Sequence, residues 1–253
     1  MENIIELKNL RKVYRIGEEK VVALDDVTLE IKRGEFCCLL GTSGSGKSTL
    51  LNLMAGLEKP TKGTIRIKGR AVEKMTEKQL AKFRQESLGF VFQSYNLLPM
   101  LTALENVSIP LTFKGMSKSR RDKKAKEMLK AVGLTSHEKH KPSQMSGGQQ
   151  QRVGIARAFV ATPEIVFADE PTGNLDSKTT KEVMGLITTM ARANNQTLVI
   201  VTHDLEIATY ADRIVHILDG NIEKIDITNN AWGSSHEEID GSFSDTDAVS
   251  AGI

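Results

Sequence analysis

The segment GTSGSGKS, residues 41–48, constrains the fold more than any other stretch, because it fits the pattern G-x-x-x-x-G-K-[ST]. It directly follows the apolar run FCCLL, typical of a buried strand, and precedes STLLNLMAG, which has helical spacing. Glycines in such a turn let consecutive backbone N–H groups face inward, and the start of the helix adds the positive end of a dipole. The sequence therefore predicts a phosphate-binding loop at the end of a strand.

Two side chains of this loop have specific predicted roles. We expect the Lys47 ammonium to reach the β- and γ-phosphates of a nucleotide, and the Ser48 hydroxyl to ligate Mg²⁺. The alternative is a glycine-rich turn that contains a lysine by chance, and the flanking strand and helix argue against it. The residues of the loop that we predict to bind the nucleotide are Gly41, Thr42, Ser43, Gly44, Ser45, Gly46, Lys47, Ser48 and Thr49.

A second apolar strand pattern, EIVFADE, ends in the adjacent acids Asp169 and Glu170. Neighbouring carboxylates repel each other, and a divalent cation beside a phosphate would offset that repulsion. We expect Asp169 to hold Mg²⁺ through water, as an acid at this position does in P-loop enzymes. Glu170 is then placed to polarise the attacking water as a general base. A pair of exposed loop acids is the alternative, and the wholly apolar strand before them argues against it.

Composition limits the class of protein. The net charge of +2 does not by itself indicate nucleic acid or a membrane surface as the partner. The only cysteines, Cys37 and Cys38, are neighbours on a predicted strand and should point to opposite faces, so we expect free thiols, as in a reducing cytoplasm. No stretch approaches the roughly 20 apolar residues of a spanning helix, and the N-terminus lacks a signal-peptide pattern. We therefore expect a cytoplasmic chain.

Strand and helix patterns alternate over most of the chain. EIVFADE and TLVIVTHD alternate with helical patterns such as KTTKEVMGLITTMARAN, which favours a mostly parallel sheet covered on both faces. The opening stretches IIELKNLRKVY and DVTLEIKRGE read as strands, whereas the segments after Ser94 read as helices that form a side lobe. From about Asn229 the chain is rich in Ser, Gly and Asp without a period, which predicts a flexible tail.

The segment MSGGQQQR, residues 145–152, resembles the LSGGQ signature of ATP-binding cassette (ABC) proteins, with Met145 in place of leucine. The resemblance covers nearly the whole chain to about residue 227, with the motifs in the order of the family. It implies an α/β fold: a P-loop NTPase core with a mostly parallel sheet, an N-terminal antiparallel β subdomain and a helical subdomain. We expect an ATPase domain at 1–228, with the helical subdomain inserted at about 94–160, and a polar tail at 229–253.

The resemblance also implies roles for residues that are not informative by themselves. Tyr14 resembles the aromatic residue that stacks on the adenine of ATP, although a strand tyrosine is usually ordinary sheet packing. Gln93, in FVFQ, resembles the Q-loop glutamine, which contacts magnesium and the attacking water. His203, in VTHD, resembles the switch histidine near the γ-phosphate. The implied catalytic residues are Glu170, His203 and Gln93, and the implied magnesium ligands are Ser48, Gln93 and Asp169.

The signature implies that two copies of the chain work together. We expect its N–H groups to touch the γ-phosphate of ATP bound by the opposite subunit of a homodimer, because a glycine stretch so far from the P-loop has little reason to bind phosphate in its own chain. Asp176, in GNLD, resembles the D-loop acid at the seam of that dimer. The signature residues that we expect to contact ATP are Ser146, Gly147, Gly148 and Gln149.

The segment LGFVFQSYNLLPMLTALENVSIPL looks like cassettes of the MacB/LolD type, which include the FtsE cassettes, and PTGNLDS agrees with that grouping. This likeness implies an FtsX-like or MacB-type permease as partner, and an ATPase held by it at the inner face of the cell membrane. The cargo would be exported or extracted drug, peptide or lipoprotein. Leu98, Pro99 and Met100 lie in a predicted loop, where apolar residues more often face a partner.

Alternative functions have weaker support. A cassette of this kind can activate cell-wall hydrolases instead of driving transport. DNA-repair cassettes insert long coiled coils and ribosome-acting ones carry two cassettes in tandem, whereas this chain has one cassette and a short insert, so we expect no nucleic acid partner. The intact acids and lysine argue against a regulatory cassette without hydrolysis. We interpret the basic run SKSRRDKKAK, residues 117–126, as a solvated helix face that could add weak attraction to anionic lipid.

Overall fold

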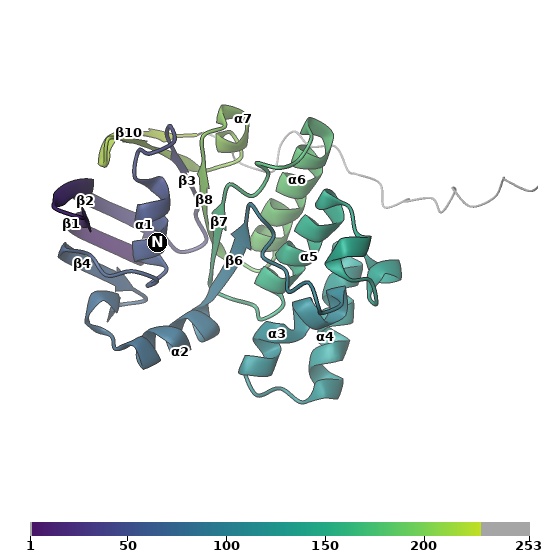
Figure 1. Ribbon diagram of the computed structural model, residues 1–253. Coiled ribbons are helices and arrows are strands. Elements are labelled where there is room, and N and C mark those ends of the chain that lie inside the picture. Colours follow the sequence, from purple (N-terminus) through teal and green to yellow (C-terminus); the bar gives the residue numbers. More distant parts are fainter. Residues whose placement is uncertain (1, 229–253) are drawn as a thin grey trace, which may run out of the picture.

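The computed structural model describes residues 2–228, so the tail predicted at 229–253 lies outside the described residues. The described part contains two sheets, one parallel and one antiparallel, with helices on both faces of the parallel sheet (Figure 1). This is the predicted α/β core with an antiparallel β portion, and that prediction is confirmed. Among residues 2–228 there is no helix with the length and apolar content needed to cross a bilayer.

The parallel sheet has six strands in the order β10-β9-β3-β8-β7-β6. All neighbouring strands pair in parallel except β9 and β10, which form an antiparallel hairpin at one edge. The strands are β3 (Phe36–Leu40), β6 (Leu88–Phe92), β7 (Ile165–Asp169), β8 (Thr197–Thr202), β9 (Arg213–Leu218) and β10 (Asn221–Ile227). The α-helices are α1 (Lys47–Met54), α2 (Glu77–Ser87), α3 (Ala103–Phe113), α4 (Lys118–Ala131), α5 (Gly147–Phe159), α6 (Ser177–Ala193) and α7 (Leu205–Ala208).

The two faces of the parallel sheet carry different cores. Successive side chains of β3 alternate between the faces, so Cys37 and Leu39 pack in one core, which includes α1, while Cys38 and Leu40 pack in another, which includes α5 and α6. Helices α1 and α5 therefore lie on opposite faces of the sheet (Figure 1). Both cysteines are free and buried, as predicted, and burial raises the pKa of the Cys38 thiol to about 12.

The antiparallel sheet has the strand order β2-β1-β4-β5 and lies beside α1 (Figure 1). Its apolar side chains, such as Leu7, Leu24 and Ile65, belong to the same core as α1. The strands are β1 (Asn3–Ile16), β2 (Glu19–Lys32), β4 (Lys62–Ile67) and β5 (Arg70–Ala71). The short β5 and the 3₁₀ turn Val72–Lys74 were not predicted, because elements of two or three residues carry no periodic signal.

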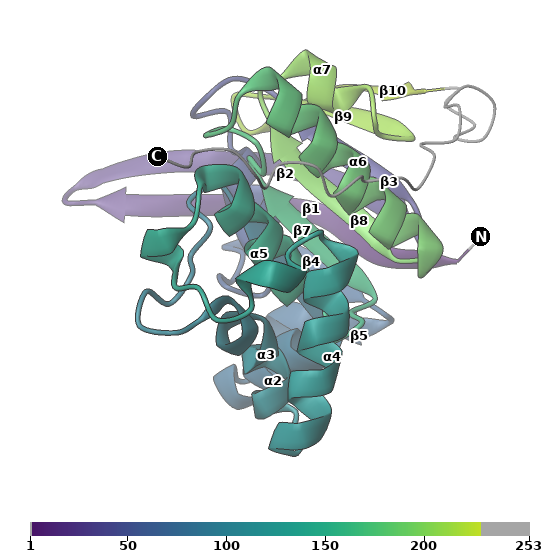
Figure 2. The same ribbon diagram turned by 90° about the vertical axis from the view of Figure 1, so that its right-hand side faces the viewer.

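Helices α3, α4 and α5 form a lobe at the edge of the parallel sheet, seen in both ribbon views (Figure 2). They share a core of their own, which includes Val107, Leu129 and Val153. Thr102 begins α3 through a capping box with Glu105, which satisfies two backbone N–H groups at the helix start. The short helix α7 covers only Leu205–Ala208, after β8.

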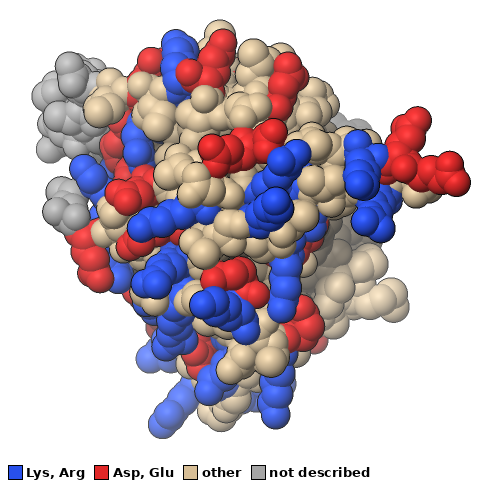
Figure 3. Space-filling model, turned by 90° about the vertical axis from the view of Figure 1, so that its left-hand side faces the viewer, with Lys and Arg blue, Asp and Glu red and all other residues tan. Residues whose placement is uncertain are grey.

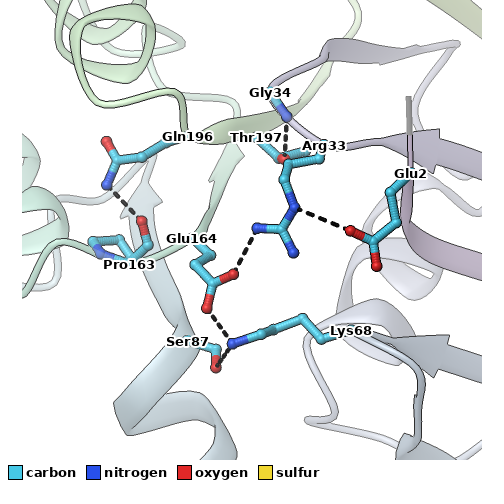
Figure 4. A network of polar contacts seen from close by, with 9 residues as sticks. All are labelled: Glu2, Arg33, Gly34, Lys68, Ser87, Pro163, Glu164, Gln196 and Thr197. Carbon is cyan, nitrogen blue, oxygen red and sulfur yellow. Dashed lines mark hydrogen bonds and ion pairs between the residues drawn. The ribbon is translucent and has the colours of Figure 1, made fainter.

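A charged network joins the two sheets at the amino ends of the parallel strands (Figure 4). Glu164, just before β7, accepts a hydrogen bond of 2.7 Å from Arg33 in the β2–β3 turn and also pairs with Lys68, which follows β4. Gly34 N–H donates to the Thr197 hydroxyl at the start of β8, over 2.9 Å. Burial alone would raise the pKa of Glu164, but the hydrogen bonds from Arg33 and Lys68 outweigh it and hold the pKa below its ordinary value.

We expect Glu164→Gln to change how stability depends on pH. A carboxylate whose pKa is lowered in the folded state stabilises that state above its unfolded pKa of about 4.3, and this contribution is lost as the pH falls through the folded pKa. The wild type should therefore lose more stability than the variant between pH 5 and pH 3. At pH 7 the variant should be less stable than the wild type by about 1 kcal/mol, a modest difference because the pair of Arg33 and Glu164 is partly exposed. Urea titrations across this range measure both effects, and parallel pH profiles of the two proteins would contradict the role of the network.

Candidate functional site

Three strand ends meet at one edge of the parallel sheet. The ladders place Leu40 of β3 opposite Thr202 of β8, and Asp169 of β7 opposite Val201 of β8. Parallel strands carry their carboxyl ends at the same edge, and ligands of open α/β sheets bind outside that edge. The topology thus brings together the loop after β3, the acids at the end of β7 and His203 after β8, which are far apart in the sequence.

The loop between β3 and α1 has the conformation that its glycines permit. Gly46 has φ 101°, and a Cβ there would lie 2.5 Å from the Ala23 carbonyl oxygen, so only glycine fits without strain. The Lys47 side chain is 6% exposed, and its Nζ donates to the carbonyls of Gly41 at 2.8 Å and Thr42 at 2.7 Å. Burial lowers the pKa of Lys47, while the charges of Glu170 and Asp169 act in the opposite direction. The ammonium is thereby held across the loop, where a phosphate would sit.

Ser48 and Asp169 face each other from α1 and β7. The Ser48 hydroxyl donates to Asp169 Oδ1 over 3.5 Å, and burial, followed by the charge of Glu170, raises the pKa of Asp169. Within residues 2–228, no group of three or more His, Cys, Asp or Glu side chains could hold a metal alone. Mg²⁺ prefers oxygen ligands and takes most of its shell from water and substrate phosphates. The donor set therefore fits Mg²⁺, which Ser48 and Asp169 would hold once a nucleotide is bound.

Glu170 is fixed from two sides. Its Oε1 lies 2.8 Å from Nδ1 of His203, and its Oε2 accepts a hydrogen bond of 3.2 Å from the Thr202 hydroxyl. Its φ of 45° is rare for a residue other than glycine, and such strain often marks functional sites. A cavity of about 450 Å³ lies between the P-loop and His203. Its lining residues are Leu40, Gly41, Thr42, Ser43, His203 and Leu205.

Gln93 lies next to the turn that follows Glu170. A Cβ added at Gly173 would lie 2.6 Å from Gln93 Nε2, and the Gln93 carbonyl accepts a hydrogen bond of 3.1 Å from Asn174. Gln93 thus connects the end of β6 to the loop after the two acids. Its contact with magnesium and water stays a prediction.

The signature residues form the start of α5. The Ser146 hydroxyl accepts a hydrogen bond of 3.3 Å from Gln149 N–H, and Gln149 Oε1 accepts one of 2.9 Å from Ser146 N–H, which completes a capping box. Gln149 Nε2 also lies 3.1 Å from Nε2 of His137. Helices α5 and α1 cover opposite faces of the sheet, and the cavity at the phosphate loop of the same chain has no signature residue in its lining.

Asp176 caps α6. Its Oδ1 accepts from Thr179 N–H at 3.0 Å and its Oδ2 accepts from the Thr179 hydroxyl at 2.7 Å. These hydrogen bonds lower the pKa of Asp176. A helix cap explains the residue within one chain, and its place at a dimer seam stays a prediction.

Tyr14 belongs to a cluster that the sequence did not reveal. Its hydroxyl donates to Glu58 at 2.7 Å, and Lys12 Nζ lies 2.9 Å from the same carboxylate and 4.9 Å from the centre of the Tyr14 ring. Asn52 of α1 donates to the other oxygen of Glu58 at 3.2 Å. Burial and the bond to Glu58 raise the pKa of Tyr14. The cluster fixes the ring beside α1, as stacking on adenine would require, and that role stays a prediction.

Comparison with known sequences identifies close relatives. The sequence model of a family described as ABC transporter matches residues 24–173. An uncharacterized ABC transporter ATP-binding protein of Thermotoga maritima is 47% identical, over 93% of this chain and 100% of its own length. The macrolide export ATP-binding/permease protein MacB of Syntrophobacter fumaroxidans is 46% identical over 87% of this chain but only 31% of its own length.

Comparison with solved structures leads to the same family as the sequence comparison. The ATP-binding cassette MJ0796 has been solved as a dimer in a post-hydrolysis state with ADP and Pi bound. It matches with a TM-score of 0.83 and 46% identity, over 88% of this chain and 98% of that one. The protein of that name from Methanocaldococcus jannaschii is 48% identical to this chain over 225 residues.

We expect Lys47→Ala to weaken ATP binding by about 10- to 100-fold, because it removes charge-assisted hydrogen bonds to phosphate. Titration of a fluorescent ATP analogue measures the change in Kd. Lys130→Ala, at an exposed position of α4, is the matched control and should bind like the wild type. Equal affinity of Lys47→Ala and the wild type would refute the assignment of the phosphate loop.

Proposed function

Because this chain belongs to the ABC transporter family and is an ATPase of that family, we propose that it dimerises around two ATP molecules and drives an FtsX-like or MacB-type permease. In this proposal the permease holds the ATPase at the inner face of the cell membrane and exports or extracts drug, peptide or lipoprotein. The name of the MacB relative combines an ATP-binding part with a permease in one chain, which supports this kind of partner.

One observation supports the proposal that the chain forms a dimer. The phosphate loop precedes α1 on one face of the parallel sheet, and the signature begins α5 on the other face. A second copy, rotated by a twofold axis, can place its own signature opposite the loop, so that each ATP contacts both copies. The relative MJ0796 forms a dimer, which supports the same arrangement.

The residues at the strand ends fit hydrolysis of the terminal phosphate. Lys47 and the loop N–H groups would bind the β- and γ-phosphates, and Mg²⁺, when bound, would neutralise charge on them. The oxygen of a water attacks the γ-phosphorus, its proton passes to Glu170, and the bond to the bridging oxygen breaks to give ADP and phosphate. His203 and Thr202 orient the Glu170 carboxylate for this step. Loss of the γ-phosphate removes the group that joins the two copies.

An apolar groove of about 500 Å³ lies between α2 and the helical lobe. Ala81 and Gln85 of α2 line one side, and Ile109, Pro110 and Phe113 of α3 line the other. Phe113, in the lining of the groove, is 71% exposed, and Leu98 and Met100, in the loop that precedes α3 in the sequence, are 50% and 75% exposed. Exposed apolar residues around a groove are typical of a partner site. We assign the groove to a cytoplasmic helix of the permease, which would transmit closure of the dimer.

We expect Glu170→Gln to bind ATP normally and to lose at least about 100-fold in turnover, because an amide cannot accept the proton of the attacking water. The variant should also accumulate as a dimer with ATP, visible by size-exclusion chromatography. Glu223→Gln, at an exposed position of β10, is the matched control and should hydrolyse ATP like the wild type. Unchanged turnover in Glu170→Gln would remove this residue from the base role.

We expect Ala81→Glu to abolish binding of the permease without changing basal hydrolysis, because it places a charge in the apolar groove on an exposed face of α2. The measurement is affinity capture from detergent-solubilised membranes of the source cells, with identification of the captured permease by mass spectrometry. Ala193→Glu, at the exposed end of α6, is the control. Capture of the same permease by Ala81→Glu would show that the groove is not the contact.

A further inference from the structure

We propose that the basic tip of the helical lobe binds the surface of an anionic lipid bilayer. The basic tip is defined as the α3–α4 turn with the exposed side of α4. The inference rests on the proposed function in one respect: the groove assigned to the permease defines which end of the molecule faces the membrane. Figures 1 and 2 show the α3–α4 turn at the lower end of the molecule, the end at which α2 and α3 also lie.

The tip is strongly basic. Lys and Arg residues far outnumber acids between the end of α3 and the end of α4, although the whole chain carries only +2. The basic residues of this stretch are Lys114, Lys118, Arg120, Arg121, Lys123, Lys124, Lys126 and Lys130, and its acids are Asp122 and Glu127. Such a concentration of one sign on a nearly balanced chain favours a partner of the opposite charge.

Acidic neighbours pair with only part of this charge. Lys118 lies 2.7 Å from Asp122, and Lys126 lies 3.3 Å from Glu138. Arg120, Lys123 and Lys124 are exposed and make no ion pair or hydrogen bond among the described residues. They point away from the lobe core, because the buried face of α4 is made by Ala125 and Leu129.

The position of the charges on α4 is unfavourable for the helix itself. The first turn of α4 contains no acid and the Ser117 side chain makes no capping hydrogen bond, while basic residues start at Lys118. Positive charge in the first turn opposes the helix dipole. A feature that weakens its own helix is better explained by a ligand outside the chain than by stability.

An exposed aromatic residue stands beside the charges. Phe113 ends α3, is 71% exposed, and also lines the groove, so the basic tip is continuous with the surface assigned to the permease. An apolar ring next to Lys and Arg fits the boundary between headgroups and acyl chains. On the other side of the groove Lys78 and Lys82 of α2 are exposed. Figure 3, which views the molecule from the left-hand side of Figure 1, shows Lys and Arg side chains interspersed with acids over much of that side, including its lower end.

Binding of the purified wild-type protein to protein-free vesicles tests the proposal. The wild-type protein should bind vesicles that contain phosphatidylglycerol and should bind phosphatidylcholine vesicles far more weakly. Its affinity for the anionic vesicles should fall as the salt concentration is raised. The triple variant Arg120→Glu, Lys123→Glu, Lys124→Glu should lose at least about 100-fold in vesicle affinity, because each basic residue near the surface contributes about fivefold. Phe113→Ser should weaken binding without changing its salt dependence.

The matched control is Lys62→Glu, Arg66→Glu, Arg70→Glu on the exposed side of the antiparallel sheet, which changes the net charge equally. It should keep vesicle binding. Three results would each overturn the proposal. They are an equal loss of vesicle affinity in both triple variants, equal binding to both kinds of vesicle, and release of the protein from the vesicles by duplex DNA at the same concentration of negative charge. Basal ATPase activity, measured on the same samples, should match the wild type in both triple variants. The vesicles contain no permease, so absence of vesicle binding would not contradict the proposed function. Failure to capture the permease would, in turn, not change the result of the vesicle experiment.

Discussion

The site depends on one constraint, that parallel strands end at the same edge of a sheet. The loop after β3, the acids after β7 and the histidine after β8 come from distant parts of the chain and meet only because these strands are neighbours in register. Their meeting brings the Lys47 ammonium, two carboxylates and an imidazole to one edge of the sheet, next to a cavity lined by the phosphate loop and His203. Lys47 offsets part of the repulsion between Asp169 and Glu170, and bound phosphate with Mg²⁺ would complete the balance of charge.

The two faces of the same sheet explain why the proposed function requires two copies of the chain. Helix α1 continues the phosphate loop on one face, and α5 carries the signature on the other. In the proposed dimer each ATP joins the loop of one copy to the signature of the other, so binding energy of the nucleotide closes the dimer and hydrolysis releases it. The groove beside the helical lobe is also lined by Arg157 and Ala158 of α5, and in the proposal it connects closure of the dimer to the permease.

Local patterns predicted most of the fold and the core of the site. The phosphate loop and the two acids are short motifs at the ends of continuous apolar runs, which are typical of buried strands, and the structure places these motifs at the same edge of the sheet. The contacts of Glu58 with Tyr14 and Lys12, and of His137 with Gln149, escaped prediction because tertiary packing alone joins those residues. The Glu164 network was missed for the same reason, since Arg33 and Lys68 come from turns of a different sheet. The roles predicted for Gln93, Asp176 and Tyr14 depend on a nucleotide or a second copy, so the contacts within one chain do not test them.

The most direct test of the account is a cross-link between two copies. Protomers carrying Ser43→Cys in the phosphate loop are mixed with protomers carrying Ser146→Cys in the signature, and both also carry Glu170→Gln. The mixture is treated with a short bismaleimide. Cys37 and Cys38 are buried and should not react. The account predicts a cross-linked dimer that forms with ATP and is absent without it. If the mixture gives no dimer, while a single chain that carries both cysteines becomes cross-linked internally, the signature acts within its own chain and the account is wrong.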